Sequence, residues 1–418
     1  MKLFITSIIF LLTISTAVSQ QQIKSFVKQY QTIIASVEND NNYSGYEAIA
    51  KAIGNKRVVM LGEQDHGDAP AFLAKTKLIK YLHEKMGFTV LAFESDFFSL
   101  TEGQSEINND TSGLRKYMRG NIFPIWPYCD ACDDLFNHYL PATFMSSAPI
   151  TVTGFDNQLH GSYTRRKINS YLDSILSLLK TEIPNYETTR SQLLTWTDSL
   201  VKNYGKKFGK KEDFENYETL MKQISMAWVQ KNGEDYTARL LQSIIGFNNQ
   251  SWHYYGRNWW EGGMMRDREM AANLDWLVNV KYKNEKIIVW AANGHIVKNS
   301  GNLSNMQHTA MGTFFCDKPG NAEQTYILGF TSAQGTAGRV TIKNGVYNIV
   351  PAKKNSFETW FGETPFAFID FLQYRSSGSN EFFLMKGGGH SYGGKQPWTQ
   401  AFDGIFYIKN MYACKKKL

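Results

Sequence analysis

Apolar and polar positions along this chain follow two different periods, and the changes between them mark its secondary structure. Four short apolar runs rich in β-branched residues predict buried strands, and segments with apolar residues at helical spacing separate them. These runs are RVVML at 57–61, TVLAFE at 89–94, ITVTGFD at 150–156 and KIIVWAANGH at 286–295. Strands that alternate with helices predict an α/β fold with a mostly parallel central sheet flanked by helices.

Two longer regions extend this core. Residues 165–282 are charged, helix-rich and too long for a simple crossover, so we expect a helical insert over the carboxyl ends of the strands. Short strand patterns and turns over 324–418 predict a β-rich C-terminal continuation of the same core. The glycine-rich segment KGGGHSYGGK at 386–395 is expected to be a flexible loop. Residues 20–418 would then form one domain.

The N-terminal segment predicts export. Residues 1–19, MKLFITSIIFLLTISTAVS, contain one lysine, an apolar run and a small-residue end at Ala17-Val18-Ser19, which is the pattern of a cleavable signal peptide. No later stretch approaches the ~20 apolar residues that a membrane-spanning helix needs. We therefore expect a secreted or periplasmic protein without stable membrane insertion.

Composition narrows the classes of partner. The 418-residue chain is 43% hydrophobic, which is enough for a sizeable core. Its formal charge of +7 becomes +6 once Lys2 leaves with the signal peptide, and the basic residues are dispersed except for the run 415–417, which we interpret as a solvated tail. A nucleic-acid-binding protein needs a concentrated basic face, so no nucleic acid partner is expected.

The cysteines suggest structural roles. In an exported protein Cys129 and Cys132 could form a local disulfide, and Cys316 and Cys414 a long-range one. A four-cysteine zinc site needs two close pairs, and the second pair is not close in sequence. Structural or free thiols are therefore favoured over a cysteine metal site.

Ionisable residues follow each of the four predicted strands. Glu63 and His66 lie just past the first strand, Glu94 ends the second, Asp156 ends the third and His295 closes the fourth. Because the carboxyl ends of parallel strands form one crevice, we expect Glu63, His66, Glu94 and His295 to converge there, beneath the helical insert. Asp156 is either part of this site or part of the loop architecture.

The first of these loops, LGEQDHGDAP at 61–70, contains two further acids. Asp65 and Asp68 come immediately before a helical pattern. Short acidic side chains at that position commonly cap the first turn of a helix. We therefore assign both residues to capping rather than to chemistry.

As an ordered set, these segments resemble the erythromycin esterase family. GEQDHG, the helix after it and LAFES look like the opening of that family. Further matches are GFDNQ at 154–158, RDREMAANL at 266–274, WAANGH at 290–295, LGFTSAQGTA at 328–337, SFETWF at 356–361 and FDGIFYI at 402–408. The resemblance implies metal-independent hydrolysis of a small-molecule ester or lactone, without a cofactor, and macrolide lactone opening is the activity that names the family.

The resemblance also implies roles for the strand-end residues. His66 would be the general base, Glu63 and Glu94 would hold the histidine and the water, and His295 would stabilise or protonate the oxygen. Histidine suits a base near neutrality, and adjacent carboxylates raise its basicity and fix its tautomer. A nucleophilic serine is not required by these roles.

Two positions depart from the family pattern. Ala292 stands where family members commonly have a second histidine, and Lys75 stands on the first helix where an arginine is expected. The substrate is therefore left open. The segment SWHYYGRNWWEGG at 251–263 supplies Trp259 and Trp260 either as a wall of an apolar cleft or as packing, and the following Arg266 and Asp267 could meet the strand-end acids.

Two alternatives use the same residues. Glu63, His66, Glu94 and His295 are legitimate ligands for zinc or manganese, so a metal-dependent hydrolase stays open, although the chain has no H-E-x-x-H motif. A non-catalytic protein that holds a ligand or haem in the same cleft is the second alternative. The sequence does not set the oligomeric state.

Overall fold

The computed structural model describes residues 21–107, 110–203, 208–254, 258–304, 306–377 and 381–417. The predicted signal peptide at 1–19 lies outside these residues. In the described ranges, no helix has both the length and the apolar character that crossing a membrane requires.

A central sheet organises the described part of the chain. Eight of its nine strands run in the order β1-β8-β11-β6-β2-β5-β3-β4, and β7 pairs with β6. The strands are β1 Thr32–Ile33, β2 Val58–Leu61, β3 Phe88–Asp96, β4 Thr151–Asp156, β5 Lys286–Trp290, β6 Thr325–Ala337, β7 Tyr347–Asn348, β8 Phe366–Asp370 and β11 Gly404–Met411. A separate ribbon pairs β9 Phe383–Leu384 with β10 Lys395–Gln396.

The pairing is parallel from β11 through β6, β2, β5 and β3 to β4, and antiparallel where β8 pairs with β11 and with β1. The expected mostly parallel α/β fold is therefore confirmed. Side chains of β2 alternate between two buried clusters, with Val58 and Met60 on one face and Val59 and Leu61 on the other. A strand buried on both faces has no polar side, which explains its continuous apolar sequence.

Helices cover both faces of the sheet. Residues 21–30 are helical. The other α-helices are α2 Tyr46–Ile53, α3 Ala69–Met86, α4 Phe97–Glu102, α5 Thr111–Asn121, α6 Leu140–Phe144, α7 Ser162–Leu178, α8 Tyr186–Lys202, α9 Lys211–Asn232, α10 Tyr236–Tyr254, α11 Trp259–Trp276, α12 Asn293–Ile296, α13 Met311–Cys316, α14 Phe371–Arg375 and α15 Trp398–Ala401. Buried residues of α2 and α3 join one core cluster, and those of α11 and α13 join the other.

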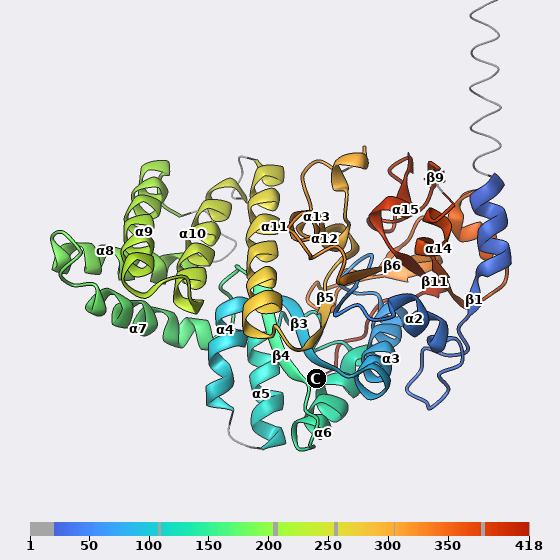
Figure 1. The fold of residues 1–418 in the computed structure, drawn as a ribbon, viewed down its shortest axis with the longest axis horizontal. Helices are drawn as coiled ribbons and strands as arrows, with labels where there is room; N and C mark the ends of the chain where they lie inside the picture. Colours follow the sequence, from blue (N-terminus) through green and yellow to red (C-terminus); the bar gives the residue numbers. More distant parts are fainter. Residues whose placement is uncertain are drawn as a thin grey trace, which may run out of the picture.

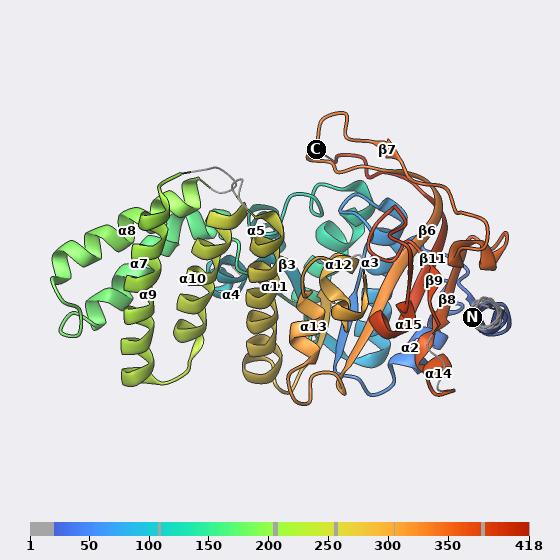
Figure 2. The same cartoon turned by 90° about the horizontal axis from the view of Figure 1, so that it is seen from above.

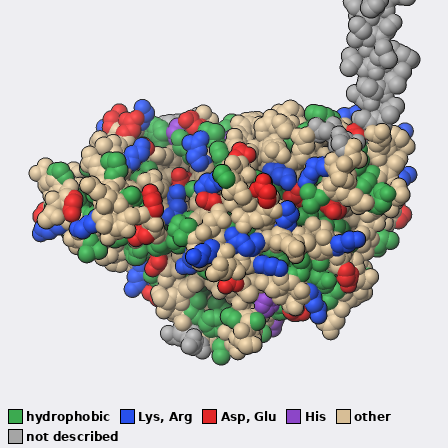
Figure 3. Space-filling model, viewed as in Figure 1, with side chains coloured by type: hydrophobic (Ala, Val, Ile, Leu, Met, Phe, Trp, Pro, Cys, Tyr) green, Lys and Arg blue, Asp and Glu red, His purple; other side chains and the backbone are tan. Residues whose placement is uncertain are grey.

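The helical insert reaches the strand carboxyl ends through α11, and the helices before α11 extend to one side (Figure 1). Helices α7 to α10 extend away from the sheet as a lobe, and α11 lies between that lobe and the sheet (Figures 1 and 2). Helix α11 contacts β4, the last strand of the sheet order, and its Arg266 binds Glu94 and Asp156, whereas α7 to α10 form a lobe beside that edge. On the face shown in Figure 3, hydrophobic side chains form small patches between charged and polar ones.

The cysteine pairing differs from the expected one. Cys129 forms a disulfide with Cys414, across 285 residues of sequence, and Cys132 and Cys316 are free thiols. Strand β11 brings the C-terminus beside the loop that follows α5, where Cys129 pairs with Lys416 in a β-bridge. The C-terminal lysines expose their side chains, but the backbone of this tail is held to the 128–130 segment and is not free.

The segment 386–395 is also more ordered than its glycines suggest. Lys386 is fully buried and donates to the carbonyls of Ala333 and Val350 at 3.0 and 2.7 Å. His390 is buried against Asp68. The segment therefore packs against the loop that follows β2 through Lys386 and His390, whereas residues 393–395 are exposed.

Candidate active site

The sheet order decides which strand ends are neighbours. Strand β5 lies between β2 and β3, although it follows both of them in sequence. The carboxyl ends of β2, β5, β3 and β4 thus present Glu63, His295, Glu94 and Asp156 side by side. A bulge shifts the register of β3 against β4 between Phe93 and Asp96, as is common where a strand aims a side chain into a site.

Glu63 is a fully buried carboxylate with three donors around it. Its Oε1 atom accepts from Nδ1 of His66 at 2.8 Å and from the indole N–H of Trp126 at 3.0 Å. Its Oε2 atom accepts from Nζ of Lys75 at 2.5 Å. Burial lowers the pKa of the Lys75 ammonium, and Glu63 opposes that shift. Lys75 also lies 4.1 Å from the ring centroid of Trp290. The buried charge of Glu63 is therefore compensated.

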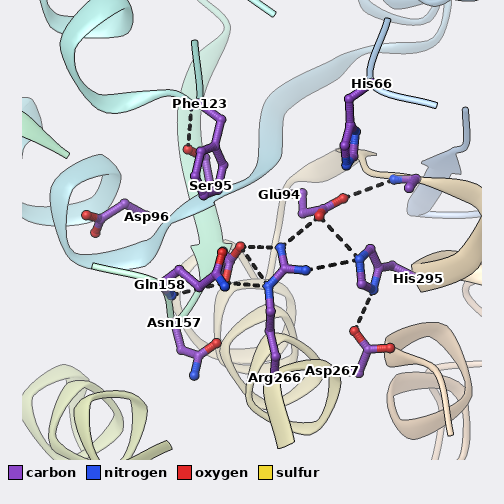
Figure 4. A network of polar contacts seen from close by, with 12 residues as sticks. His66, Glu94, Ser95, Asp96, Phe123, Asn157, Gln158, Arg266, Asp267 and His295 are labelled. Atoms are coloured by element: carbon purple, nitrogen blue, oxygen red, sulfur yellow. Dashed lines mark hydrogen bonds and ion pairs between the residues drawn. The ribbon is translucent and has the colours of Figure 1, made fainter. Parts of the chain in front are cut away.

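His66 has one nitrogen committed and one available. Because Glu63 is surrounded by donors, its carboxylate accepts the Nδ1 proton and leaves Nε2 as the basic nitrogen. The His66 side chain is 15% exposed, and its ring points toward Glu94 (Figure 4). No described residue is recorded as a hydrogen-bond partner of Nε2.

Glu94 lies at the centre of the cluster. Its Oε1 atom is 2.7 Å from Nη2 of Arg266 and 3.3 Å from Nε2 of His295, and its Oε2 atom accepts from the Ala292 backbone N–H at 3.0 Å. Burial by itself would raise the pKa of Glu94, but the positive charges of His295 and Arg266 outweigh it and hold that pKa well below its usual range. Glu94 is therefore ionised at neutral pH.

Arg266 comes from α11 and connects two strand ends. Its guanidinium contacts both oxygens of Asp156, with Nε 3.2 Å from each, and it also donates to Glu94. Because Arg266 and Asp156 are buried, each needs the charge of the other. The structure thus brings Asp156 and Arg266 into the cluster, where the sequence had left both open.

His295 carries the second imidazole–carboxylate pair. Its Nδ1 atom lies 2.5 Å from Oδ1 of Asp267, whose Oδ2 is 3.2 Å from Nε2 of His308. Burial alone would lower the pKa of His295, but Asp267 and Glu94 raise it to about 9. The pKa of Asp267 is lowered, because His295 and its hydrogen bond outweigh the effect of burial.

One contact tests this charge assignment. Nη1 of Arg266 lies 3.1 Å from Nε2 of His295, and a guanidinium can only donate, so an attractive contact would need a neutral ring. Glu94, Asp156 and Asp267 carry three negative charges against the single positive charge of Arg266. We therefore assign the protonated ring, whose Nε2–H faces Glu94 while Arg266 crowds it.

Asp65 and Asp68 do not cap helix α3. Asp68 stands at the N-cap position, but its side chain accepts no hydrogen bond from the first turn of the helix. The carboxylate instead accepts from the Asp65 backbone N–H at 2.9 Å and contacts Nε2 of His390 at 2.7 Å. Asp65 binds Arg339 at 2.7 Å and the Tyr347 hydroxyl at 2.6 Å. Both aspartates therefore tie the loop of His66 to the C-terminal part of the chain.

Close backbone packing fixes the two loops against each other. A Cβ atom on Gly62 would lie 1.9 Å from Oδ1 of Asn293, so this position requires glycine. Asn293 in turn accepts from the Phe330 backbone N–H at 3.0 Å and donates to the Gly387 carbonyl at 2.8 Å. These buried hydrogen bonds hold the start of the His295 loop beside the end of β2.

The predicted aromatic segment lies at the surface. Trp259 and Trp260 are 63% and 47% exposed, which excludes core packing for both. Trp260 lies 6.1 Å, between ring centroids, from His308, which contacts Asp267. Residues 255–257, which include Tyr255, fall outside the described residues. The structure thus places Trp260 near the outer side of the His295 pair.

Sequence reasoning missed Trp126 and His308. Trp126 donates to Glu63, and His308 contacts Asp267, but each lies in a loop without a strand or helix signal next to it. A lone tryptophan or histidine in a loop has no periodic pattern that would mark it, so only the three-dimensional contacts identify these two residues.

The donor set of the cluster does not resemble a metal site. Both oxygens of Glu63 and both of Glu94 are engaged by N–H donors, including Lys75 and Arg266. Two such cations would repel a metal ion held between the carboxylates. Among the described residues, the ligand atoms close enough to form a three-residue metal site belong to Cys129, Asp130 and Cys414, where the two cysteines are joined in the disulfide.

Comparisons with known proteins agree on one family. The family model for erythromycin esterase matches residues 83–411. YbfO of Bacillus subtilis, which is named as a candidate hydrolase, is 27% identical over 353 residues. The match covers 78% of this chain and 77% of that protein. Erythromycin esterase type II of Escherichia coli is 26% identical over 298 residues, which cover 62% of this chain and 65% of that enzyme.

A solved structure shows the same fold. It belongs to an erythromycin esterase mutant in its open conformation and superimposes with a TM-score of 0.66. The match covers 93% of this chain and 99% of that one at 15% sequence identity.

Proposed function

Because this chain belongs to the erythromycin esterase family, we propose that it hydrolyses an ester or lactone with a water molecule that His66 activates. The family match and the hydrolase relative identify a hydrolase. The bond that is cleaved, the roles of the residues and the exported location are the proposal. The observation that supports it is the pair of histidines beside Glu94, each held at Nδ1 by a buried carboxylate.

His66 is the general base in this proposal. Its Nε2 lone pair takes a proton from water, and the resulting hydroxide forms the new bond to the carbonyl carbon. The imidazolium that results is stabilised by Glu63 through the Nδ1–H bond. Lys75 binds the other oxygen of Glu63, so that the Oε1 atom of Glu63 stays directed at His66.

His295 has the complementary role. Its protonated Nε2 donates to the carbonyl oxygen as negative charge develops, or delivers its proton to the leaving alkoxide when the carbon–oxygen bond breaks. A pKa of about 9 keeps that proton in place at neutral pH. The nearby positive charge of Arg266 favours release of the Nε2 proton of His295. Glu94 lies between the two imidazoles and orients the water for attack.

No step of this proposal passes through a metal ion. The N–H donors around Glu63 and Glu94 support that choice, because they occupy the oxygens that a metal would need. The substrate is an ester or lactone of a small molecule. Macrolides are one candidate, since the related Escherichia coli enzyme is named for erythromycin. The exposed Trp259 and Trp260 would bind an apolar part of such a substrate.

The test is turnover by variants of the base and its partner. On an ester identified by a broad screen for the mass gain of one water, His66→Asn and Glu63→Gln should each lower kcat by at least ~10²-fold. His138→Asn is the matched control, because this histidine is mostly exposed and its ion-pair partner among the described residues is Asp133. Chelators should leave the wild-type rate unchanged.

Circular dichroism would show that the variants are folded. The proposal is refuted by a folded His66→Asn protein with near-normal kcat. Loss of wild-type activity with a chelator and recovery with zinc would favour the metal-dependent alternative.

We also propose that the protein is exported. Two observations support this: the signal-peptide pattern at 1–19 and the disulfide between Cys129 and Cys414. Disulfides persist in oxidising compartments and are rare in the cytosol. The N-terminus of the mature chain tests the proposal, since it should follow Ser19.

A further inference from the structure

A basic hollow lies next to the candidate active site. It consists of two adjoining depressions of about 410 and 460 Å³, which share Arg119, Gly120 and Tyr128. The first is also lined by Ile122, Phe123, Pro124, His160, Ser162 and Arg165, and the second by Ser112, Arg115 and Lys116. We call the combined hollow the basic groove. Helix α5 and the first turn of α7 form its sides.

The charges of the basic groove are uncompensated within the described residues. Arg115, Lys116, Arg119 and Arg165 line it, and no Asp or Glu does. Arg115 donates to the Asn137 carbonyl and the Thr111 hydroxyl, both neutral, and among the described residues no carboxylate forms an ion pair with any of the four cations. The next residue on α7 behaves differently, because Arg166 is paired with Glu106.

The inner wall of the basic groove is also the outer wall of the active site. Phe123 and His160 stack on each other with ring centroids 3.7 Å apart. The Ser95 hydroxyl, on the residue after Glu94, accepts from the Phe123 backbone N–H at 3.0 Å and lies 3.0 Å from Nε2 of His160. Figure 4 shows Phe123 and Ser95 in the same view as Glu94 and His66.

A second contact links the basic groove to the general base. The ring centroids of Phe123 and Trp126 are 6.5 Å apart, and Trp126 donates to the Glu63 carboxylate that holds His66. Phe123 and Trp126 therefore connect the cationic surface to the Glu63–His66 pair.

We propose that the basic groove binds an anionic group of the substrate, a carboxylate or a phosphate, while the ester of the same molecule lies between His66 and His295. This inference rests on the proposed function and names its substrate class as an anionic ester. Arginine suits the role, because its planar guanidinium binds carboxylates and phosphates through paired hydrogen bonds. Several cations around one hollow also attract anions from solution.

The experiment compares matched esters. One set carries a carboxylate, a phosphate or a neutral methyl group at the end of the acyl chain, and a second set carries it at the end of the alcohol chain. The wild-type enzyme and the double variant Arg119→Gln/Arg165→Gln are assayed for kcat/KM. Arg166→Gln is the control, because Arg166 lies next to Arg165 on α7 but is paired with Glu106 and is not among the cations that line the basic groove.

We expect the wild type to prefer at least one anionic ester over its neutral counterpart by about tenfold, as one charge-assisted hydrogen bond would provide. The double variant should lose that preference and keep its rate on the neutral ester. The control should keep both. Whether the preferred ester carries a carboxylate or a phosphate shows which of these groups the basic groove binds.

Two results would overturn the inference. One is a wild type that turns over neutral and anionic esters equally well. The other is a preference that survives in the folded double variant. If the wild type cleaves no ester at all, the proposed function fails instead. Calorimetry with the matching non-hydrolysable amides then tests separately whether the basic groove binds an anionic group. Binding of an anionic amide that the double variant loses supports the basic groove, and absence of binding refutes it.

Discussion

Replacing Asp267 by Asn tests the electrostatics of the second imidazole directly. The amide keeps the size of the carboxylate, and its oxygen can still accept the Nδ1 proton of His295, so the ring should stay in place. What disappears is the negative charge 2.5 Å from Nδ1, which is the largest of the interactions that raise the pKa of His295 to about 9. We expect that pKa to fall toward its ordinary value of 6.5.

The magnitude follows from the size of the shift. A rise from 6.5 to about 9 corresponds to about 3 kcal/mol, since each unit is worth roughly 1.4 kcal/mol. The folded-state pKa lies above the unfolded one, so this stability is fully present below pH 6.5 and is lost as pH rises through about 9. In Asp267→Asn most of this pH-dependent contribution should be absent.

The assay has a kinetic and an equilibrium part. If protonated His295 is required, wild-type kcat/KM should fall as pH rises through about 9, and in Asp267→Asn that fall should begin at lower pH. Urea unfolding of both proteins across the same pH range measures the linked stability. Asp275→Asn is the control, because it lies on the same helix and binds Lys318 and Asn321 away from the site.

The reasoning is wrong if the alkaline limb of the rate profile has the same midpoint in Asp267→Asn as in the wild type. It is equally wrong if the difference in unfolding free energy between the two proteins does not change with pH. Either result would mean that His295 is neutral in the folded protein and accepts from Arg266.

Two further predictions concern the buried lysine and the export of the chain. Lys75→Met should lower the free energy of unfolding by about 3 to 5 kcal/mol, because it leaves the buried Glu63 charge unpaired. Lys85→Met, at an exposed position on the same helix, should change the free energy of unfolding by less than about 0.5 kcal/mol. Equal effects of the two substitutions in urea titrations would contradict the assigned ion pair. Protein recovered from outside the cytoplasm should have the intact mass of a chain that begins after Ser19. In that protein, Cys129 and Cys414 should resist alkylation until they are reduced. A full-length cytoplasmic chain with both thiols free would refute export.

Much of the fold was present in the sequence because its signals are local. The apolar runs at 57–61, 89–94, 150–156 and 286–295 predicted four of the buried strands, the last of which ends at Trp290, because a strand covered on both faces is mostly apolar along its length. The same locality limited the prediction. The glycine-rich 386–395 segment looked flexible, yet buried contacts of Lys386 and His390 with distant residues hold it.

The cysteines and the aspartates show the same limit. Cys129 pairs with Cys414 and not with its neighbour Cys132, because strand β11 delivers the C-terminus to the loop after α5. Asp68 occupies a helix N-cap position, as its sequence position predicted, but its side chain binds His390 from the other end of the chain. A partner more than 280 residues away leaves no mark in the pattern around either residue.

The sequence by itself determined which chemical groups end the strands: Glu63 and His66, then Glu94, then Asp156, then His295. Only the tertiary structure decided how they combine. By inserting β5 between β2 and β3, the sheet places His295 next to Glu94, and α11 then adds Arg266 and Asp267 from the insert. The physical reason is that strand identity depends on residues in contact along the chain, whereas strand order and the ionisation of buried side chains depend on which distant charges fold against one another.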